Sequence, residues 1–344
     1  MTVKVGQILA GRAHGGAELF YDRLVPALHR RVAQVAIVRP EGERADSLAA
    51  AGVPTYPFRF GSRHLDWRTR LGIARTLRLE GAALAITWMS RASQLTRPGI
   101  CPVAARLGGF YSMRSFRHCR RFIPITEGLA RHVAAAGVPR DRIHVIGNFV
   151  DETDAEPLDR GAFDTPPDAP LLFTCGRLHA NKGFDVLLHA MTRVPDAYVW
   201  IAGDGPLEAS LRALCTRLGL DGRVRFLGWR SPVTAFLRTA DAFVCPSRHE
   251  PHGNIVLEAW AHGCPIVATD THGPAELIEH GRTGWLCANE DADDMASGIR
   301  QVLGDRALAG DLAEAAGARY RERFSSAHIL DRYEEFIDIA VRDP

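Results

Sequence analysis

Residues 171–191 read LLFTCGRLHANKGFDVLLHAM, and this stretch decides the fold. The first five residues, Leu171–Cys175, form an apolar run with the length and composition of a buried strand. A loop with two glycines and two cations follows, and Gly183–Met191 then shows the apolar spacing of a helix. A strand that leads through a glycine-containing loop into a helix is the repeating unit of a parallel α/β sheet.

The same alternation continues on both sides of this stretch. Short runs rich in Val, Ile and Leu predict the other strands: Val3–Leu9, Gln34–Val38, Thr55–Phe58, Leu84–Thr87, Val103–Leu107, Phe122–Ile125, Tyr198–Ala202, Val224–Phe226, Ala242–Cys245 and Ile266–Ala268. Helical patterns lie between them: Ala17–Arg31, Asp66–Glu80, Pro206–Leu218, Ile255–His262 and Asp293–Leu303. We therefore expect two doubly wound, Rossmann-like α/β domains whose parallel sheets face a central cleft.

The stretch DETDAEPLDRGAFDTPPDAP at 151–170 separates the two series. It is acidic and holds four prolines, which indicates a linker or a domain boundary. We predict a first domain at 1–160, a second at 161–325, and a terminal helix within 326–344 that no strand follows.

Composition excludes several classes of protein. With 344 residues, 46% hydrophobic and 24% charged, the chain is neither disordered nor collagen-like. The net charge of +2 does not indicate a nucleic-acid partner. Residues 1–165 carry 24 basic and 15 acidic residues (+9), and 166–344 carry 18 and 25 (−7), which sum to +2. The halves could face different partners, or both could be solvated surfaces.

The seven cysteines include no C-x-x-C pair, so the sequence predicts neither a disulfide framework nor a zinc site. A reducing cytoplasm fits this pattern best. The N-terminal apolar run is shorter than a signal peptide needs, and no apolar stretch approaches the roughly 18 residues of a membrane span. We expect a cytoplasmic protein, with any membrane contact made peripherally on the inner face.

Two glycine-containing loops suit anions. Gly15-Gly16 opens the helix after the first strand, where backbone N–H groups are free, although a plain tight turn is the alternative. Arg177 and Lys182 lie five residues apart after strand Leu171–Cys175 and could hold a diphosphate or could be two surface cations. Lys182 is favoured for a function because the chain has 40 arginines and only one other lysine, Lys4.

The segment SRHEPHGNIVLEA at 247–259 carries two carboxylates that can face one pocket. Glu250 lies in the loop and Glu258 lies one turn inside the following helix. A carboxylate accepts two hydrogen bonds side by side, which suits the vicinal hydroxyls of a sugar, although Glu258 could also be an ordinary helix residue. The N–H groups at the helix start suit phosphate or sugar oxygens; they belong to Gly253, Asn254 and Ile255. A glycosidase carboxylate pair is a rival interpretation, but it leaves the neighbouring cations without a task.

These motifs, in this order and spacing, resemble glycosyltransferase family 4. Three further segments agree: Gly203-Asp204-Gly205-Pro206, Pro246-Ser247 and Gly281-Arg282-Thr283-Gly284. The resemblance implies the GT-B fold, a terminal helix that crosses back to the first domain, and retaining transfer of a sugar from a nucleotide diphosphate donor. Pathways for lipopolysaccharide core or other cell-surface saccharides are typical of such arginine-rich bacterial members.

The resemblance also implies roles for residues. Arg177 and Lys182 would bind the donor diphosphate, Glu258 the ribose, and Glu250 the donor sugar, with backbone contacts from Gly253, Asn254 and Ile255. Gly16 would close over the phosphate, and Arg230 would lie near the base. Arg177, Lys182 and Glu250 are the expected catalytic residues, through stabilisation of the leaving diphosphate during a front-face displacement.

Two departures from the family pattern stand out. The histidine that many members carry at the end of strand Val103–Leu107 is missing, so Arg106 or His118 is a candidate substitute toward the acceptor. His252 replaces an aromatic residue that often follows the Glu-Pro pair. The family needs no cofactor and usually no metal, and Asp291-Ala292-Asp293 precedes a predicted helix, where it suits a helix start better than a metal site.

The acceptor is expected on the first domain. The basic run at 114–121 could contact phosphates of a lipid-linked or core saccharide, or an anionic membrane, or could be merely solvated. Two other functions remain open: a nucleotide-sugar epimerase, and an inactive nucleotide-sugar-binding partner subunit. A DNA-glucosylating enzyme is disfavoured by the small net charge.

Overall fold

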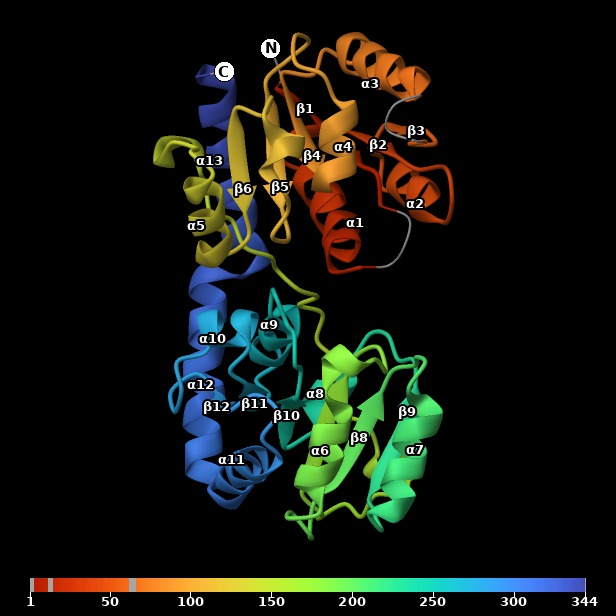
Figure 1. The fold of residues 1–344 in the computed structure, drawn as a ribbon, viewed down its shortest axis with the longest axis vertical. Coiled ribbons are helices and arrows are strands. Elements are labelled where there is room, and N and C mark those ends of the chain that lie inside the picture. The colour runs from red at the N-terminus through yellow and green to blue at the C-terminus, as the bar shows by residue number, and fades with distance from the viewer. Residues whose placement is uncertain (1–2, 12–14, 62–65, 344) are drawn as a thin grey trace. The chain divides into compact units, whose positions relative to one another are not determined.

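The computed structural model describes residues 3–11, 15–61 and 66–343 (Figure 1). The chain divides into two compact units, one of Met1–Phe149 with Ser326–Pro344 and one of Val150–Ser325. The boundary therefore precedes the one that composition placed at 160. The physical reason is that Val150 and Leu158 already pack on the hydrophobic core of the second unit.

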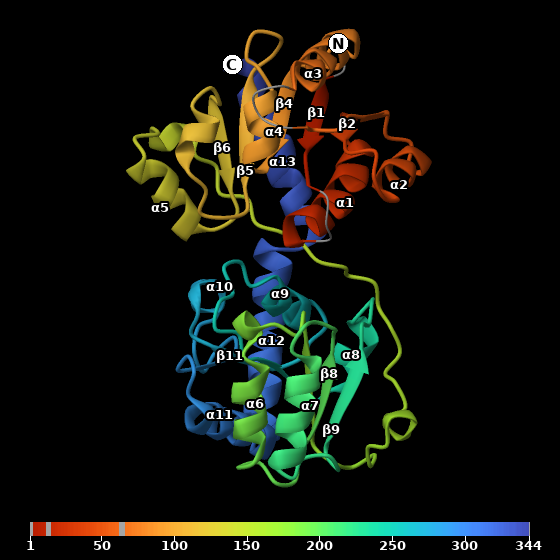
Figure 2. The same cartoon turned by 45° about the vertical axis from the view of Figure 1, so that its right-hand side comes forward.

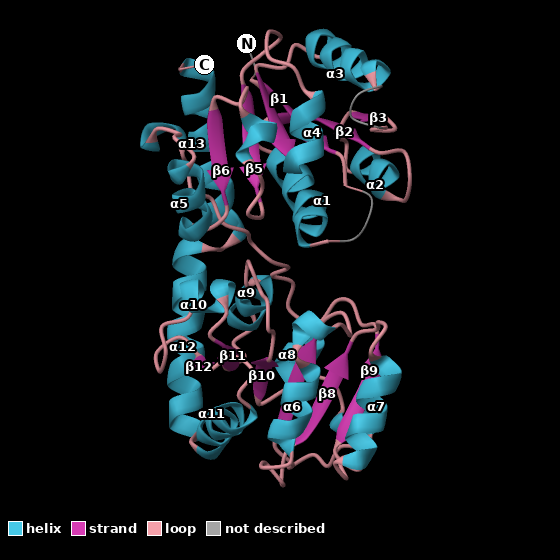
Figure 3. Ribbon diagram, in the orientation of Figure 1, coloured by secondary structure: helices cyan, strands magenta, loops and turns pink. Residues whose placement is uncertain are grey.

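The first unit is built on a six-stranded sheet in the order β3-β2-β1-β4-β5-β6, and all paired strands run parallel (Figure 3). The strands are β1 (Lys4–Leu9), β2 (Ala33–Val38), β3 (Thr55–Pro57), β4 (Leu84–Trp88), β5 (Val103–Leu107) and β6 (Arg121–Pro124). The helices are α1 (Gly16–His29), α2 (Arg44–Ala50), α3 (Trp67–Leu79), α4 (Met89–Leu95), α5 (Glu127–Ala135), η1 (Met113–Phe116) and η2 (Arg140–Arg142).

The C-terminal helix α13 (Ser326–Arg342) belongs to this first unit, where it packs against α1 and β4 (Figure 2). Its apolar residues recur at helical spacing, and Tyr333, Phe336 and Ile337 are fully buried in one core cluster of the unit. This burial, and not a local sequence signal, attaches a helix to a sheet whose last strand lies about two hundred residues earlier.

The second unit repeats the architecture with the sheet order β12-β11-β10-β7-β8-β9, again parallel throughout. The strands are β7 (Leu171–Cys175), β8 (Tyr198–Ala202), β9 (Val224–Gly228), β10 (Ala242–Cys245), β11 (Ile266–Thr269) and β12 (Trp285–Cys287). The helices are α6 (Phe184–Met191), α7 (Glu208–Arg217), α8 (Thr234–Thr239), α9 (Asn254–Ala261), α10 (His272–Leu277), α11 (Ala292–Gly304), α12 (Arg306–Arg323), η3 (Arg160–Phe163) and η4 (Ala180–Lys182).

Two doubly wound α/β domains are thus confirmed. The described residues include no helix that is long and apolar enough to cross a bilayer. In the second sheet β7 lies between β10 and β8. The carboxyl ends of parallel strands meet at one edge, so the loops after β7, β8 and β10 are neighbours there, which is where α/β sheets bind ligands.

Candidate functional site

Two loops of the second unit, after β7 and after β10, are locked together by backbone contacts. The amide groups of Arg248 and His249 both donate to the Asn181 carbonyl oxygen, at 2.9 and 3.2 Å. Gly183 ends the first loop with φ of +63°, and a Cβ at this position would overlap the carbonyl oxygen of Pro246. Only glycine therefore permits this approach.

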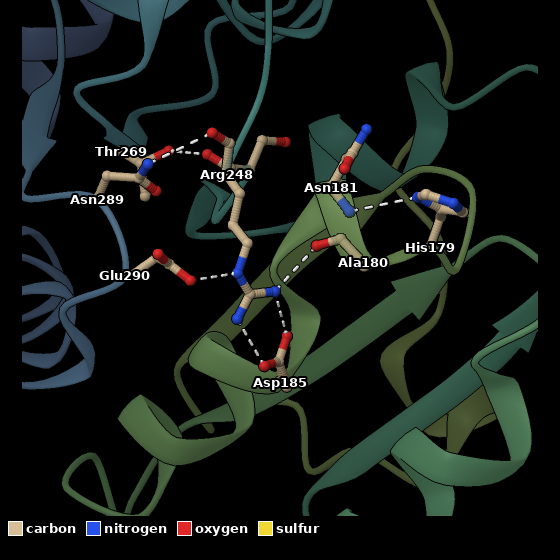
Figure 4. A network of polar contacts seen from close by, with 9 residues as sticks. His179, Ala180, Asn181, Asp185, Arg248, Thr269, Asn289 and Glu290 are labelled. Carbon is tan, nitrogen blue, oxygen red and sulfur yellow. Dashed lines mark hydrogen bonds and ion pairs between the residues drawn. The ribbon is translucent and has the colours of Figure 1, made fainter.

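The Arg248 side chain connects the same loops with ionic contacts (Figure 4). Its guanidinium makes a two-pronged pair with Asp185 at 2.8 and 2.7 Å, donates from Nε to Glu290 at 2.6 Å, and donates to the Ala180 carbonyl at 2.9 Å. Hydrogen bonds from Arg248 to Asp185 hold the pKa of that carboxyl below its usual range. Such a planar, two-pronged contact fixes geometry as well as charge.

Lys182 and Glu250 form an ion pair between these loops, with Nζ 2.6 Å from Oε2. The side chains are 29% and 12% exposed, so the pair is largely shielded from water. Burial by itself lowers the pKa of Lys182, but the Glu250 carboxylate outweighs burial and the net shift is upward. Lys182 therefore stays charged at neutral pH, as a cation that meets a diphosphate must.

The Glu250 loop is fixed from its other side by two glycines. The amide of Gly253 donates to Oε1 of Glu250 at 3.3 Å, and the amide of Gly273 donates to its backbone carbonyl at 2.7 Å. Gly253 has φ of +68°, and a Cβ on Gly273 would lie only 2.5 Å from the Gly253 nitrogen. Backbone packing at this density sets the direction in which the Glu250 carboxylate points.

Glu258 lies at the same edge of the sheet. It belongs to α9, which begins at Asn254 directly after Gly253, and it is half-buried. Burial raises the pKa of the Cys175 thiol, and the carboxylate of Glu258 raises it further, so Glu258 lies within electrostatic range of the end of β7. Asn254 and Ile255, both half-buried, lie in the first turn of α9, and the N-termini of helices are a common place for anions and sugar oxygens to bind.

The loops after β7 and β8 also touch. Gly203 has φ of +143°, and a Cβ there would overlap the Gly176 carbonyl, while the Leu178 amide donates to the Asp204 carbonyl at 2.7 Å. This contact places Arg177 at the surface. Within the described ranges its guanidinium has no hydrogen-bond or ion-pair partner, so it is available to a ligand.

Arg230 was predicted near the base of the nucleotide, which stays a prediction. It follows β9, at the far edge of the sheet and two strands away from β7, and is exposed. The contact that its guanidinium makes is a donation to the backbone carbonyl of neighbouring Trp229 at 3.2 Å. The structure does not bring Arg230 together with Lys182, Glu250 and Glu258.

In the first unit, Gly15 caps α1 and Gly16 is its first residue. The Glu18 side chain folds back toward this turn, and its Oε2 would lie 2.6 Å from a Cβ placed on Gly15, although a carboxylate end can move aside. The Gly16 backbone is exposed at the carboxyl end of the first sheet. The chain therefore presents the helix start that the sequence predicted, and closure of Gly16 over a phosphate stays a prediction.

Arg106 is a structural residue, contrary to its predicted contact with an acceptor. Its side chain is 1% exposed and stacks on the rings of Trp88 and Phe20, at 4.2 and 4.6 Å from their centroids. Nε donates to the hydroxyl of Tyr333 at 3.2 Å, and Nη2 donates to the amide oxygen of Asn148. The guanidinium thus holds α13 on the sheet.

His118 is also poorly placed for the predicted contact with an acceptor. It precedes β6 by three residues and so lies at the amino end of the sheet, while Gly16 lies beyond the carboxyl end of β1. It is half-buried against α4, and burial lowers the pKa of its imidazole. Arg121, the last residue of the basic run, is buried and ion-paired with Asp343.

The candidate metal motif has a structural explanation. Asp291 caps α11, and its carboxylate accepts hydrogen bonds from the amides of Asp293 and Asp294 at 2.9 Å each. Across the part of the chain that the structure describes, no three His, Cys, Asp or Glu side chains gather in a way that could hold a metal ion. Metal independence itself stays a prediction.

Comparison with known families assigns both units. Residues 169–305 match the family model described as glycosyl transferases group 1, and residues 14–154 match the one described as glycosyltransferase family 4. The chain is 37% identical, over 94% of its length and 96% of the relative's, to the lipopolysaccharide core biosynthesis glycosyltransferase LpsE of Rhizobium meliloti (strain 1021).

Solved structures agree on the fold. A glycosyltransferase from Rickettsia africae ESF-5 superimposes with a TM-score of 0.89 at 17% identity and covers all of both chains. Alr3699/HepE from Anabaena, in complex with UDP and glucose, gives a TM-score of 0.83 at 22% identity and covers 98% of this chain and 99% of its own. The expected fold is therefore confirmed.

Proposed function

This chain belongs to glycosyltransferase family 4, and we propose that it transfers a sugar from a nucleotide diphosphate donor to a saccharide or lipid-linked acceptor. It is a glycosyltransferase of cell-surface polysaccharide synthesis, and its likeness to a lipopolysaccharide core enzyme makes that core the pathway to test first. The observation that carries the donor assignment is the Lys182–Glu250 pair at the edge of the second sheet, to which α9 with Glu258 also belongs.

The chemistry of this edge suits a nucleotide sugar. Arg177 and the charged Lys182 supply two cations for a diphosphate, and together they would stabilise the negative charge that develops as the nucleoside diphosphate leaves. The Glu258 carboxylate can accept two hydrogen bonds from the ribose diol. The first turn of α9 can donate to the donor sugar.

Retention follows from the family's mechanism, in which the acceptor attacks from the face that the leaving group vacates. An oxygen of the leaving phosphate can then take the acceptor proton, so this route requires no protein base. A route without a protein base agrees with the first unit, where the Arg106 side chain is buried and hydrogen-bonded to Tyr333 and Asn148. No metal or cofactor is needed for these steps, because the cations of the loop carry the charge.

We also propose that the first unit works at an anionic membrane surface. Helix α3 exposes Trp67, Leu71 and Leu79 at 61, 61 and 75%. The exposed residues Arg68 and Arg75 belong to the same helix, which carries no acidic residue. Apolar and basic side chains that share an exposed helix suit binding in the headgroup region.

A donor screen tests the proposed function. Calorimetry against UDP-, GDP- and ADP-sugars should show one nucleotide class bound, with a UDP-hexose first to be tried because a structural relative was solved with UDP and glucose. Mass spectrometry should then show one hexose added to a truncated core acceptor, with an α linkage by NMR when the donor is α. An isomerised nucleotide sugar formed without acceptor would instead indicate an epimerase, and binding without turnover an inactive subunit.

The membrane proposal has its own test. Sedimentation with phosphatidylglycerol vesicles should pull down the wild type at low salt and release it at high salt. The variant Leu71→Asp/Leu79→Asp should stay in the supernatant while donor affinity is unchanged. Equal sedimentation of variant and wild type would contradict a role for α3.

A further inference from the structure

The first unit contains a pocket that the proposed transfer reaction does not use. It has a volume of about 410 Å³, which is within the range of small-molecule sites. Its wall comprises residues before β6 and residues of the turn after α5. The residues that line it are Ser112, Met113, Arg114, Phe116, Arg117, Cys119, Arg120, Phe122, Ala136, Gly137, Val138, Pro139 and Arg142.

The lining is strongly basic. It includes four arginines and no acidic residue. Arg114, Arg117 and Arg142 are exposed, and within the described ranges none of these three forms an ion pair with a carboxylate. By contrast, Arg121 and Arg140 just outside the pocket are neutralised by Asp343 and Glu127. Positive charge is thus concentrated at one concavity while its neighbours are paired.

The rest of the wall is apolar. Phe116 and Phe122 are buried, and Met113, Val138 and Pro139 complete a surface without charge. A guanidinium beside such a surface binds an anion more strongly than one in open water, because the effective dielectric constant is lower. The same surface can contact a sugar ring or a short methylene chain attached to the anion.

The position of the pocket separates it from the donor edge. Its residues lie at the amino end of β6. The segment 112–120 leads directly into Arg121, the first residue of that strand. Arg142 is held at the same end, because its neighbour Ile143 pairs with Phe122. Gly15 and Gly16 follow the carboxyl end of β1, at the opposite end of the same sheet. The Lys182 cluster belongs to the other unit.

We propose that this pocket binds a phosphate-bearing group, a phosphomonoester or a diphosphate that carries a sugar ring or a short apolar segment. The guanidinium groups of Arg114, Arg117 and Arg142 can each offer two parallel N–H donors. This arrangement matches the geometry and the double charge of a phosphate group better than it matches a carboxylate. The proposal does not depend on the transfer reaction, so it can fail while the glycosyltransferase activity stands.

The test is calorimetry of the full-length chain with inorganic phosphate, pyrophosphate and glucose 6-phosphate. The variant Arg117→Ala/Arg142→Ala should bind glucose 6-phosphate at least tenfold more weakly than the wild type, with UDP affinity unchanged within twofold. The matched control Arg217→Ala/Arg323→Ala removes two exposed charges from the second unit and should leave both affinities unchanged. Because these arginines are exposed, the variants should keep the wild-type melting temperature.

Three outcomes would overturn the proposal. The first is wild-type affinity for glucose 6-phosphate in the pocket variant. The second is competition between UDP and glucose 6-phosphate, which would assign the phosphate to the donor site. The third is a protein that binds no soluble phosphate compound but binds phosphatidylglycerol vesicles through Arg117 and Arg142. That result would indicate a membrane contact instead of a pocket. If the alanine variant is unstable, Arg117→Gln/Arg142→Gln gives the same comparison with less loss of packing.

Discussion

The Nζ atom of Lys182 lies 2.6 Å from Oε2 of Glu250, a residue 68 positions later in the chain. The pair joins the loop after β7 to the loop after β10 at the carboxyl edge of the second sheet, the edge at which parallel α/β sheets generally bind ligands. It also raises the pKa of Lys182 against the effect of burial. The Glu250 carboxylate thus both orients the Lys182 ammonium group and favours its charged form.

Removing the cation should remove most of the catalysis. In Lys182→Gln, no ammonium remains to stabilise the leaving diphosphate, so we expect kcat to fall by about 100- to 1000-fold, the range measured for loss of one preorganised donor. Initial rates at saturating donor and acceptor measure this. The matched control is Lys4→Gln, which removes the chain's other lysine and its 2.7 Å pair with Glu80. Similar losses in both variants would contradict a catalytic role for Lys182.

Glu250→Gln should change the pH dependence. Without the carboxylate, the pKa of Lys182 loses its two largest upward contributions, and burial, the largest contribution of all, lowers it. Activity needs the protonated amine, which exists below its pKa, so the alkaline limb of the kcat/KM profile should move to lower pH in the variant. Profiles between pH 6 and about 10.5 measure this. A variant that loses activity equally at all pH values would show that Glu250 acts on the donor and not through Lys182.

Much of this site was predictable because its signals are local. Lys182 and Glu250 lie in the loops after the buried strands β7 and β10, Glu258 lies in the helix that follows the second loop, and apolar runs identified both strands. β12 was missed, since only three residues pair there and two of them are half-buried, which leaves no apolar run.

Tertiary contacts were out of reach. The roles of Gly273 and Arg248 depend on packing between loops far apart in sequence, and an arginine two residues before Glu250 carries no signal of its own. Arg106 was misassigned for the same reason. Its partners Phe20, Trp88, Asn148 and Tyr333 come from four separate segments, so an arginine that ends an apolar strand seemed available to a ligand.

Arg248→Lys should lower activity more than stability. Lysine keeps the charge but cannot make the planar contact with Asp185 while also reaching Glu290 and the Ala180 carbonyl. The pair is partly exposed, so we expect a loss of about 0.5–1 kcal/mol in the free energy of unfolding. A small displacement of the Lys182 loop should still reduce kcat/KM about 10- to 100-fold.

The control for this variant is Arg212→Lys, which alters an exposed arginine paired with Glu208 on α7. It should change neither the urea midpoint nor kcat/KM measurably. If Arg248→Lys keeps full activity, Arg248 contributes only to stability and does not position Lys182.

Glu258→Ala should weaken donor binding without unfolding the chain. Loss of two charge-assisted hydrogen bonds to the ribose diol should raise the Kd for the nucleotide by about 10- to 100-fold or more. Calorimetry with the bound nucleotide measures this, and Glu208→Ala on α7 serves as a control for an exposed helix glutamate. A nucleotide affinity equal to that of the wild type would exclude Glu258 from the ribose site.

Tyr333→Phe should destabilise the first unit through a single atom. The Tyr333 hydroxyl accepts from Nε of Arg106 at 3.2 Å, and both side chains are buried, so phenylalanine leaves a charged donor without that acceptor. A buried donor left unsatisfied costs about 1–3 kcal/mol, so the free energy of unfolding from urea titration should fall by that amount and the midpoint should move to lower urea. Tyr198→Phe is the control, because within the described residues the Tyr198 hydroxyl has no hydrogen bond and its ring lies under Arg225.

If Tyr333→Phe has the wild-type midpoint, stacking on Trp88 and Phe20 and the hydrogen bond to Asn148 suffice to hold Arg106. The attachment of α13 then rests on its apolar face alone.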